Sequence, residues 1–309
     1  WADKAFPPSY RSAIVEVSRQ FADHLSKKEW TRTIFEGFWN NKVDFKRRGW
    51  SRGSSPWLLD EPSNFQDYWA LHWYGQAFHE GVAQAGGKAV LGFRCDISRP
   101  QWQRELFDGL LNVNVVSGDA FSRYRRLALD RKRQSNGGQI IQVYGSTNAL
   151  EGSNYQPVGW CLDTWTRGAD GVIPWQTVGT ARSWDQADTL SLLYPSTSAQ
   201  GRGPFASIRL KAYLRGQQDV EYLALLTKVL KEPRWSIGSA ARASLKLDLT
   251  RRAADSGAIE DAGRNDYDGL RPQDLEAFRR QVGAFLSSRR PVLERTPETL
   301  IQPNRVEKR

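Results

Sequence analysis

The sequence predicts an α/β fold of the (β/α)8-barrel type, of which the C-terminal five strand–helix units are visible, followed by a helical C-terminal cap. Short apolar runs alternate with stretches of helical periodicity along the first 180 residues, as is typical of parallel strands joined by helices. Beyond this point only helical patterns remain. We therefore divide the chain into residues 1–180, the barrel part, residues 181–289, a loop plus helical cap packed on the barrel, and residues 290–309, a charged tail.

The alternation begins with a helix. Its apolar residues recur at three- and four-residue spacing, which defines one face of an amphipathic helix: Ile14, Val17, Phe21 and Leu25. Strands are then expected to begin near Thr33, Ala89, Val113, Gln139 and Gly171. The helices expected between these strands cover residues 65–82, 99–111, 120–134 and 157–168. In the cap, a loop over residues 194–204 leads into helices over residues 207–230, 239–256 and 272–288. We expect the five strands to be parallel, to be neighbours in chain order, and to be buried on both faces.

A complete barrel of this type has eight strands, and only one helix precedes the first strand here. We expect the missing strands upstream of Trp1 or on a companion chain. The 309 residues contain no methionine, not even an initiator, which favours a processed chain or the later part of a longer polypeptide.

Composition and charge limit the classes of partner that the chain is expected to bind. The formal net charge of +10 would suit nucleic acid if the basic residues were gathered on one face, but they are scattered along the sequence, so nucleic-acid binding stays a minor alternative. Cys95 and Cys161 are far apart and show no metal-ligand spacing, so we expect no metal site, cofactor or disulfide framework. No run reaches the roughly 20 apolar residues of a membrane span. The compartment is undetermined, with a secreted or periplasmic location favoured.

The predicted barrel indicates where to look for site residues, because the catalytic groups of such barrels lie at the C-terminal ends of the strands. Carboxylates, tryptophans, amides and an arginine follow the predicted strands, and flat aromatic rings beside polar groups are typical of a sugar site. The candidates for substrate binding are Trp39, Asn40, Asn41, Arg94, Tyr144, Trp175 and Gln176. For two other tryptophans, Trp160 and Trp165, packing between helix and barrel is the favoured interpretation.

A longer pattern covers residues 194–226, "YPSTSAQGRGPFASIRLKAYLRGQQDVEYLALL". It resembles the C-terminal signature of the proteins grouped as domain of unknown function 4091, which include the glycoside hydrolase family 123 enzymes. The similarity includes Arg209, Arg215 and Asp219, and it departs from the family pattern at Ser196. The segment 167–175, "RGADGVIPW", is similar to the last barrel strand of the family. We expect the helical part of the signature to be structural, with its arginine and glutamate side chains pairing on one face.

The triplet Asp60, Glu61 and Pro62 is similar to the acidic motif of this family. The resemblance implies a glycosidase that acts on a hexosamine-containing glycan with retention, in which the 2-acetamido group of the substrate is the nucleophile. By motif match, Asp60 would hold the acetamido N–H and Glu61 would protonate the leaving oxygen. Pro62 disfavours helical torsions at Glu61, so we expect an extended backbone there.

Three alternatives stay open. Asp60 and Glu61 could be acids that cap the helix expected at Phe65, in which case Glu36 and Asp96 become the reserve acids. The chain could also be a non-catalytic glycan-binding or assembly protein on a glycosidase-like barrel, which would bind glycans without turnover. An electrostatic nucleic-acid binder would lose affinity steeply with salt.

Overall fold

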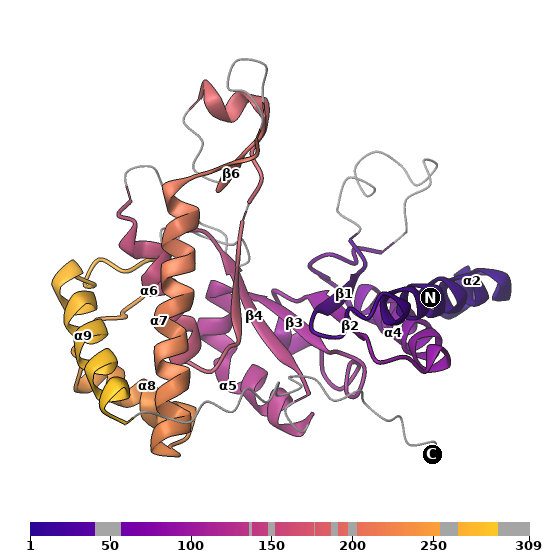
Figure 1. Cartoon of the computed structure of the whole chain (residues 1–309). Helices are drawn as coiled ribbons and strands as arrows, with labels where there is room; N and C mark the ends of the chain where they lie inside the picture. The colour runs from indigo at the N-terminus through magenta and orange to yellow at the C-terminus, as the bar shows by residue number, and fades with distance from the viewer. Residues whose placement is uncertain are drawn as a thin grey trace. The chain divides into compact units, whose positions relative to one another are not determined.

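The computed structural model describes residues 1–40, 57–135, 138–147, 152–175, 177–186, 191–196, 203–253 and 265–289 (Figure 1). The tail expected over residues 290–309 lies outside the described residues. The helices are α1 (Ala2–Ala5), α2 (Pro8–Lys27), α4 (Phe65–Ala85), α5 (Gly118–Gln134), α6 (Tyr155–Thr166), α7 (Ile208–Leu230), α8 (Arg234–Ala243) and α9 (Pro272–Ser288), with short 3-10 turns η2 (Pro100–Trp102) and η3 (Ala181–Trp184). The strands are β1 (Ile34–Phe38), β2 (Val90–Asp96), β3 (Val113–Ser117), β4 (Ile140–Gly145), β5 (Gly171–Pro174), β6 (Leu193–Tyr194), β7 (Phe205–Ala206), β8 (Arg252–Ala253) and β9 (Asn265–Asp266).

Strands β1 to β5 form one five-stranded sheet in the order β1-β2-β3-β4-β5, and pairs β1–β2, β2–β3 and β4–β5 are parallel. The predicted order of neighbours is therefore confirmed, as it would be in part of a barrel wall. The prediction that every strand is buried on both faces is wrong for β1 and β5, whose residues are only partly buried, whereas every residue of β3 is buried. The reason is position, because β1 and β5 are the two outer strands in this order.

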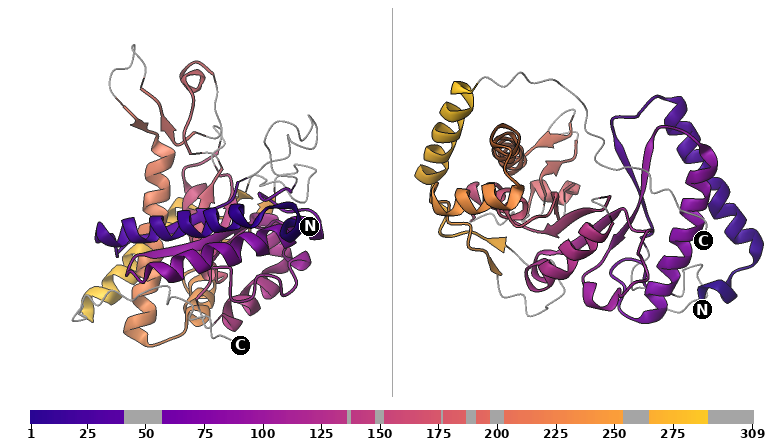
Figure 2. Two further views of the ribbon diagram at one scale, coloured as in Figure 1. Left: turned by 90° about the vertical axis from the view of Figure 1, so that its right-hand side faces the viewer. Right: turned by 90° about the horizontal axis from the view of Figure 1, so that it is seen from below.

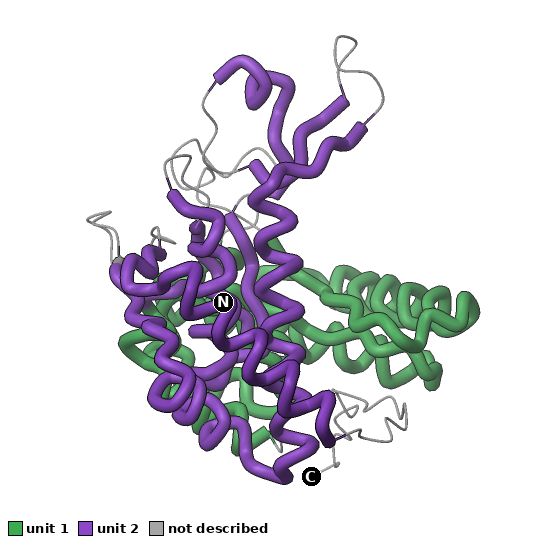
Figure 3. The backbone as a smooth tube through the Cα atoms, turned by 60° about the vertical axis from the view of Figure 1, so that its left-hand side comes forward, with its two compact units in different colours: residues 1–116, 120–141, 298–309 green, residues 117–119, 142–297 purple. Residues whose placement is uncertain are grey.

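The chain divides into two compact units (Figure 3). Of the residues that the structure describes, those within 1–116 and 120–141 form unit 1, and those within 117–119 and 142–289 form unit 2. The expected division near residue 180, between barrel and cap, stays a prediction. No helix among the described residues is both long and apolar enough to cross a membrane.

In unit 1, helices α2 and α4 run alongside each other (Figure 2). They approach closely at Gly81, where a Cβ atom would lie 2.1 Å from the carbonyl oxygen of Val15. The predicted apolar face of α2 needs correction. Leu25 is buried as expected, but Val17 and Phe21 are 51% and 60% exposed, because α2 turns small residues such as Ala22 inward instead.

The helix expected over residues 99–111 is also wrong. Only the turn η2 forms there, followed by further turns. Arg104 and Gly109 have positive φ angles of 50° and 74°, which break a right-handed helix twice within six residues. The apolar residues of this segment are buried all the same, because Phe107 and Leu111 lie in the core of unit 1.

In unit 2, α6 packs against α7 at Gly216, where a Cβ atom would lie 2.9 Å from Cys161. The signature segment is structural here. Arg209 donates to the hydroxyl of Tyr194 at 3.2 Å, and the Asp219 carboxylate, fully buried, accepts from Arg279 of α9 at 2.8 Å. The expected pairing of an arginine with a glutamate is replaced by this aspartate, which also lies 3.8 Å from Arg215.

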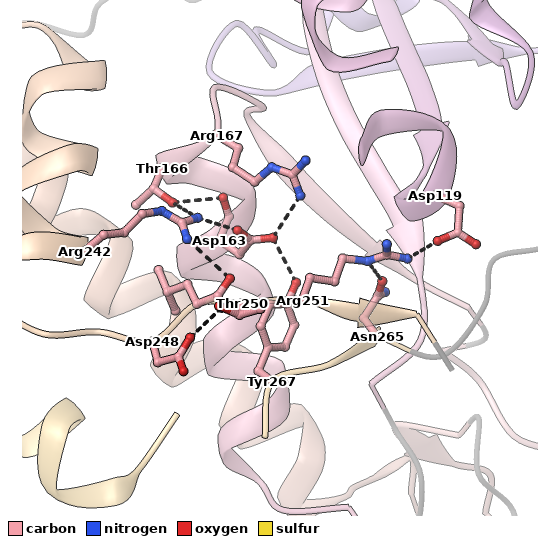
Figure 4. Close-up of polar contacts among 11 residues, drawn as sticks. Asp119, Asp163, Thr166, Arg167, Arg242, Asp248, Thr250, Arg251, Asn265 and Tyr267 are labelled. Atoms are coloured by element: carbon pink, nitrogen blue, oxygen red, sulfur yellow. Dashed lines mark hydrogen bonds and ion pairs between the residues drawn. The ribbon is translucent and has the colours of Figure 1, made fainter. Parts of the chain in front are cut away.

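A second buried carboxylate, Asp163 on α6, accepts from Arg242 at 2.5 Å and from the hydroxyl of Tyr267 at 3.2 Å, with Arg167 at 3.5 Å (Figure 4). These contacts join α6 to α8 and to the segment after β9. Figure 4 also shows Arg251 between Asp119 and Asn265.

The helix expected over residues 239–256 is shorter and starts earlier than predicted. Helix α8 ends at Ala243, and the chain then leaves helical torsions at Lys246, whose φ is 53°. The buried side chains of Leu247 and Leu249 lie in this non-helical segment, which continues into β8. Burial of these two leucines outweighs the local helical preference of the sequence.

Candidate active site

The candidate site of unit 1 is built on one face of β1 and β2. Phe38 pairs with Arg94 in the parallel register, and alternation along each strand places Glu36 with Phe38, and Asp96 with Arg94, on the same face. Parallel pairing brings the C-terminal ends of both strands to the same edge. Two reserve acids and one substrate-binding candidate therefore meet at that edge, although Glu36 lies 58 positions from Arg94 in the sequence.

Arg94 is the centre of this group. Its Nε and Nη2 atoms donate to the two oxygens of Asp96 at 2.8 and 3.0 Å, and its Nη1 atom donates to Glu36 Oε2 at 3.1 Å. The guanidinium lies 4.4 Å from the centroid of the Phe38 ring. The three charged side chains retain 15% to 24% exposure, so the group is partly open to solvent. A guanidinium held by two carboxylates and an aromatic face has a fixed orientation.

Asp60 and Glu61 directly follow a buried stretch that includes Trp57 and Leu59. Asp60 itself is only 5% exposed. Glu61 has a φ of +57°, so the expectation of an extended backbone there is wrong. A left-handed conformation at a non-glycine residue costs about 1 kcal/mol or more, and such conformations cluster at functional sites.

The loop that carries the acid pair is organised by Asp67. Its carboxylate accepts from the backbone N–H of Leu58 at 3.0 Å and of Ser63 at 3.1 Å, and Asn64 and Asp67 form the capping box of α4. The N-cap of α4 is thus supplied by residues other than Asp60 and Glu61. The capping role considered for the acid pair therefore falls to Asn64 and Asp67.

Ser98 connects the two parts of the site. Its hydroxyl, two residues beyond the end of β2, donates to Glu61 Oε1 at 3.0 Å. The Glu61 carboxylate also acts electrostatically on Asp96. Sequence reasoning missed Ser98, although its position directly after a strand that ends in an acid was a signal that could have found it.

The electrostatics of the group centre on Asp96. Burial raises the pKa of Asp96 above its ordinary value of 3.8, Arg94 opposes the rise, and the charges of Glu61 and Glu36 add to it. A carboxyl with a raised pKa beside other carboxyls is the arrangement expected of a group that holds a proton for catalysis. Structural ion pairs can share this property, so geometry has to support the assignment.

Trp39 packs against helix α4. Its ring contacts the rings of Tyr74 and Phe78 on α4 and of Phe93 on β2, with centroid separations of 5.3 to 5.6 Å. It also lines a cavity of about 320 Å³ together with Glu36 and Phe38 of β1 and Val17 and Phe21 of α2. Alternation places Trp39 on the opposite face of β1 from Glu36 and Phe38. This placement favours packing between sheet and helix for Trp39.

The remaining sugar-binding candidates are distributed between the units. Asn40, which follows β1, is exposed. Asn41 and Gln176 lie outside the described residues. In unit 2, Tyr144 is 7% exposed and pairs with Ile173, while Trp175 is 43% exposed and donates its backbone N–H to Gly145 at 2.7 Å. The packing role expected for Trp160 is confirmed by its 1% exposure and by its edge contact with Tyr213.

No group of three or more His, Cys, Asp or Glu residues in the described ranges is arranged to hold a metal ion. Both cysteines are buried thiols. The groups around Arg94 offer acid–base and electrostatic chemistry, from carboxyls beside a guanidinium.

No protein-family model and no curated protein matches the sequence. Among solved structures, the fold is similar to that of a family 123 glycoside hydrolase from Clostridium perfringens, described in a study of glycolipid glycan hydrolysis. The TM-score is 0.48 and the sequence identity 12%, over 79% of this chain. The match covers 43% of the length of the clostridial protein, so this chain corresponds to less than half of it.

Proposed function

We propose that the chain is a glycoside hydrolase that acts on a hexosamine-containing glycan and retains the anomeric configuration. One observation carries the proposal. Glu61 accepts a hydrogen bond from Ser98 next to the C-terminal end of β2, where Arg94 donates to Asp96 and Glu36. This is the edge at which barrel enzymes place their catalytic groups. The resemblance of the Asp60–Pro62 triplet and of residues 194–226 to the family 123 pattern supports the same reaction class.

In the proposed reaction, Asp60 accepts a hydrogen bond from the acetamido N–H of the substrate and orients that group. The acetamido carbonyl oxygen attacks the anomeric carbon, the glycosidic C–O bond breaks, and Glu61 transfers its proton to the leaving oxygen. Water then adds to the anomeric carbon from the opposite side, the bond to the acetamido oxygen breaks, and the proton returns to Glu61. The two steps together retain the configuration.

The test compares two 2-acetamido-2-deoxyglycosides, one with an activated aryl leaving group and one with a sugar as leaving group. Glu61→Gln should lower kcat on the sugar substrate by about two to four orders of magnitude and affect the aryl substrate far less, because a good leaving group needs little protonation. Asp60→Asn should reduce turnover of both substrates alike. Glu80→Gln is the matched control, since Glu80 lies on the surface of α4 in an exposed ion pair with Arg11.

The proposal fails if both site variants keep full glycosidase activity, or if a substrate that carries a hydroxyl in place of the acetamido group is cleaved equally well. Loss of activity in the Glu80→Gln control would show that the assay reports folding rather than chemistry.

The second candidate is a non-catalytic glycan-binding or assembly protein. The burial of Asp60 favours it, because a carboxylate that is 5% exposed can serve to fold the loop rather than to meet a substrate. This candidate predicts glycan binding without turnover on the same panel, and unchanged binding in Glu61→Gln.

A secreted or periplasmic location is part of the proposal, because hexosamine-containing polymers are mainly found outside the cytoplasm. The completion of the barrel by further strands, from the same polypeptide or a companion chain, stays a prediction. Sequencing the upstream coding region would test both.

A further inference from the structure

Helix α5 of unit 1 has a buried side and an exposed side (Figure 1). On the buried side, Phe121 and Ala128 are 2% and 0% exposed. Arg131 anchors the same side, because it donates to the carbonyl oxygen of Pro100 at 2.5 Å and to that of Arg104 at 3.1 Å. These contacts fix the rotation of the helix about its axis, so the residues on the opposite side face solvent.

The exposed side of α5 is basic. The helix contains one residue with non-helical torsions, Tyr124, and after it residues seven positions apart lie on the same face. Two pairs of cations have this spacing, Arg125 with Lys132 and Arg126 with Arg133. The side chains of Arg126 and Arg133 are 95% and 71% exposed, Arg125 is exposed, and Lys132 is partly buried. We call these four residues the basic face of α5.

One carboxylate lies among these cations. Asp130 accepts a hydrogen bond from Arg133, and its other oxygen lies 4.0 Å from Nε of Arg126. Four cations and one carboxylate leave a net charge of +3 within residues 125–133, without the inward Arg131. Ion pairs as exposed as these contribute little to stability, and like charges on one helix face repel each other. The fold therefore gains little from this arrangement, which favours a role in binding.

The spacing of the cations indicates which polyanion fits. Seven residues of helix span about 10 Å, so both rows of the basic face repeat at this interval. Nucleic acids carry a phosphate about every 3.4 Å along each strand, which is roughly three times as dense. Two linked sugar rings have about the length of two helical turns. A polysaccharide with one acidic group in every second sugar therefore matches the spacing better.

We propose that the basic face of α5 binds an acidic polysaccharide that carries about one negative charge per disaccharide. The inference rests on the proposed function, because it assigns acidic sugar units to the same glycan that contains the hexosamine. Arg131 joins α5 to Pro100, which lies two residues after the Ser98 that donates to Glu61. The basic face thus belongs to the same unit as the proposed acid, and it holds the polymer there through several exposed charge contacts.

The test measures the affinity of the full chain for labelled hyaluronan fragments, whose disaccharide contains one carboxylate and one N-acetylhexosamine, by fluorescence anisotropy at low salt. Arg126→Gln combined with Arg133→Gln should weaken binding by about tenfold, because exposed charge contacts are weak singly but add. Asp130→Asn should strengthen binding by about threefold, since it removes the carboxylate from the basic face. Both differences should shrink as salt is raised.

The matched control is Arg271→Gln in unit 2. Arg271 is 68% exposed and pairs with Asp274 three positions away, as Arg133 pairs with Asp130. Its loss should leave the affinity unchanged. The inference is overturned if the double variant on α5 binds as tightly as the parent, or if Arg271→Gln weakens binding by the same factor as the two α5 substitutions, since only net charge would then matter.

Further probes distinguish other partners. A neutral oligomer of N-acetylglucosamine should bind equally well to the parent and to the double variant on α5. Single-stranded DNA of the same net charge as the hyaluronan fragments, and vesicles with anionic lipid, should bind more weakly than the fragments do. Tighter binding of DNA or of vesicles, lost in the double variant, would overturn the polysaccharide assignment in favour of that partner.

The two proposals fail separately. A chain that binds hyaluronan fragments through the basic face but cleaves no aminosugar linkage would refute the hydrolase and leave the basic face standing. A chain that cleaves aminosugar linkages but has the same affinity for the fragments in the double variant would refute the basic face and leave the hydrolase standing.

Discussion

The Arg94 group of unit 1 and the buried aspartates of unit 2 use the same residue types in opposite proportions. Around Arg94, the carboxylates of Asp96 and Glu36 contact one guanidinium, and the side chains keep part of their exposure. In unit 2, Asp219 faces Arg215 and Arg279. Asp163 likewise faces two arginines, and it also accepts from Tyr267.

We call the groups in unit 2, in which one aspartate binds two arginines, clamps. They differ in this respect from a site that can exchange protons. An aspartate that is buried between two guanidiniums joins helices, as Asp219 joins α7 to α9 and Asp163 joins α6 to α8. A guanidinium among several carboxyls leaves one of them available for protonation. The ratio of acid to base, together with exposure, is therefore more informative than the presence of an ion pair.

The largest effect is expected at the clamp on α7. Asp219→Ala should lower the free energy of unfolding by about 3–5 kcal/mol, because it leaves Arg279 buried without its main acceptor. Urea unfolding followed by circular dichroism measures the change. Asp274→Ala, which removes the partner of the exposed Arg271, is the control and should cost much less. Equal losses in the two variants would contradict the clamp.

A conservative substitution at the second clamp, Asp163, should lower stability less than Asp219→Ala does. Asp163→Asn keeps the size of the side chain but replaces one acceptor with a donor that faces Arg242 and Arg167. We expect a loss of about 1–3 kcal/mol in the free energy of unfolding. Activity on an aryl glycoside, measured well below the unfolding temperature, should be unchanged. A loss of activity in the fully folded variant would show that this region contributes to the site.

The pH dependence of stability should reveal the raised pKa of Asp96 in unit 1. Because the pKa of Asp96 is raised in the folded state, its protonation stabilises the fold. That contribution is fully present below its ordinary pKa of 3.8 and is lost as pH rises through the raised value. The unfolding free energy of the parent should therefore fall relative to Asp96→Asn as pH rises above about 4, with a slope of at most about 1.4 kcal/mol per pH unit. A difference that stays constant from pH 3 to pH 7 would contradict the assignment.

The smallest effect on stability is expected at Ser98. Ser98→Ala removes one hydrogen bond to Glu61 and should cost about 1 kcal/mol in unfolding free energy. Because the bond orients the proposed acid, kcat on a substrate with a poor leaving group should fall more than kcat on an aryl glycoside. Ser98→Thr keeps the hydroxyl and should restore most of the difference. An equal effect on both substrates would limit Ser98 to a structural role.

The sequence determined the features of this protein that depend on local patterns. Alternation of apolar runs with helical periodicity predicted five strands in order, and the structure confirms their order in the sheet. The acids Glu36 and Asp96 were identified because they lie near strand ends, and the strands of a parallel sheet present those ends at one edge. The periodicity of the peptide backbone is a property of neighbouring residues, so it can be read without knowledge of the fold.

Only the tertiary structure decided which residues meet. Glu61 contacts Ser98, which lies 37 positions away in the sequence. The backbone of Glu61 is left-handed, whereas Pro62 predicted an extended conformation. Trp39, expected at a sugar site, packs under α4, while the apolar Phe21 is exposed on α2. Apolar periodicity marks a residue as fit for burial, but the neighbours that bury it come from distant segments. The free energy of their packing depends on register and crossing geometry, which no local pattern contains.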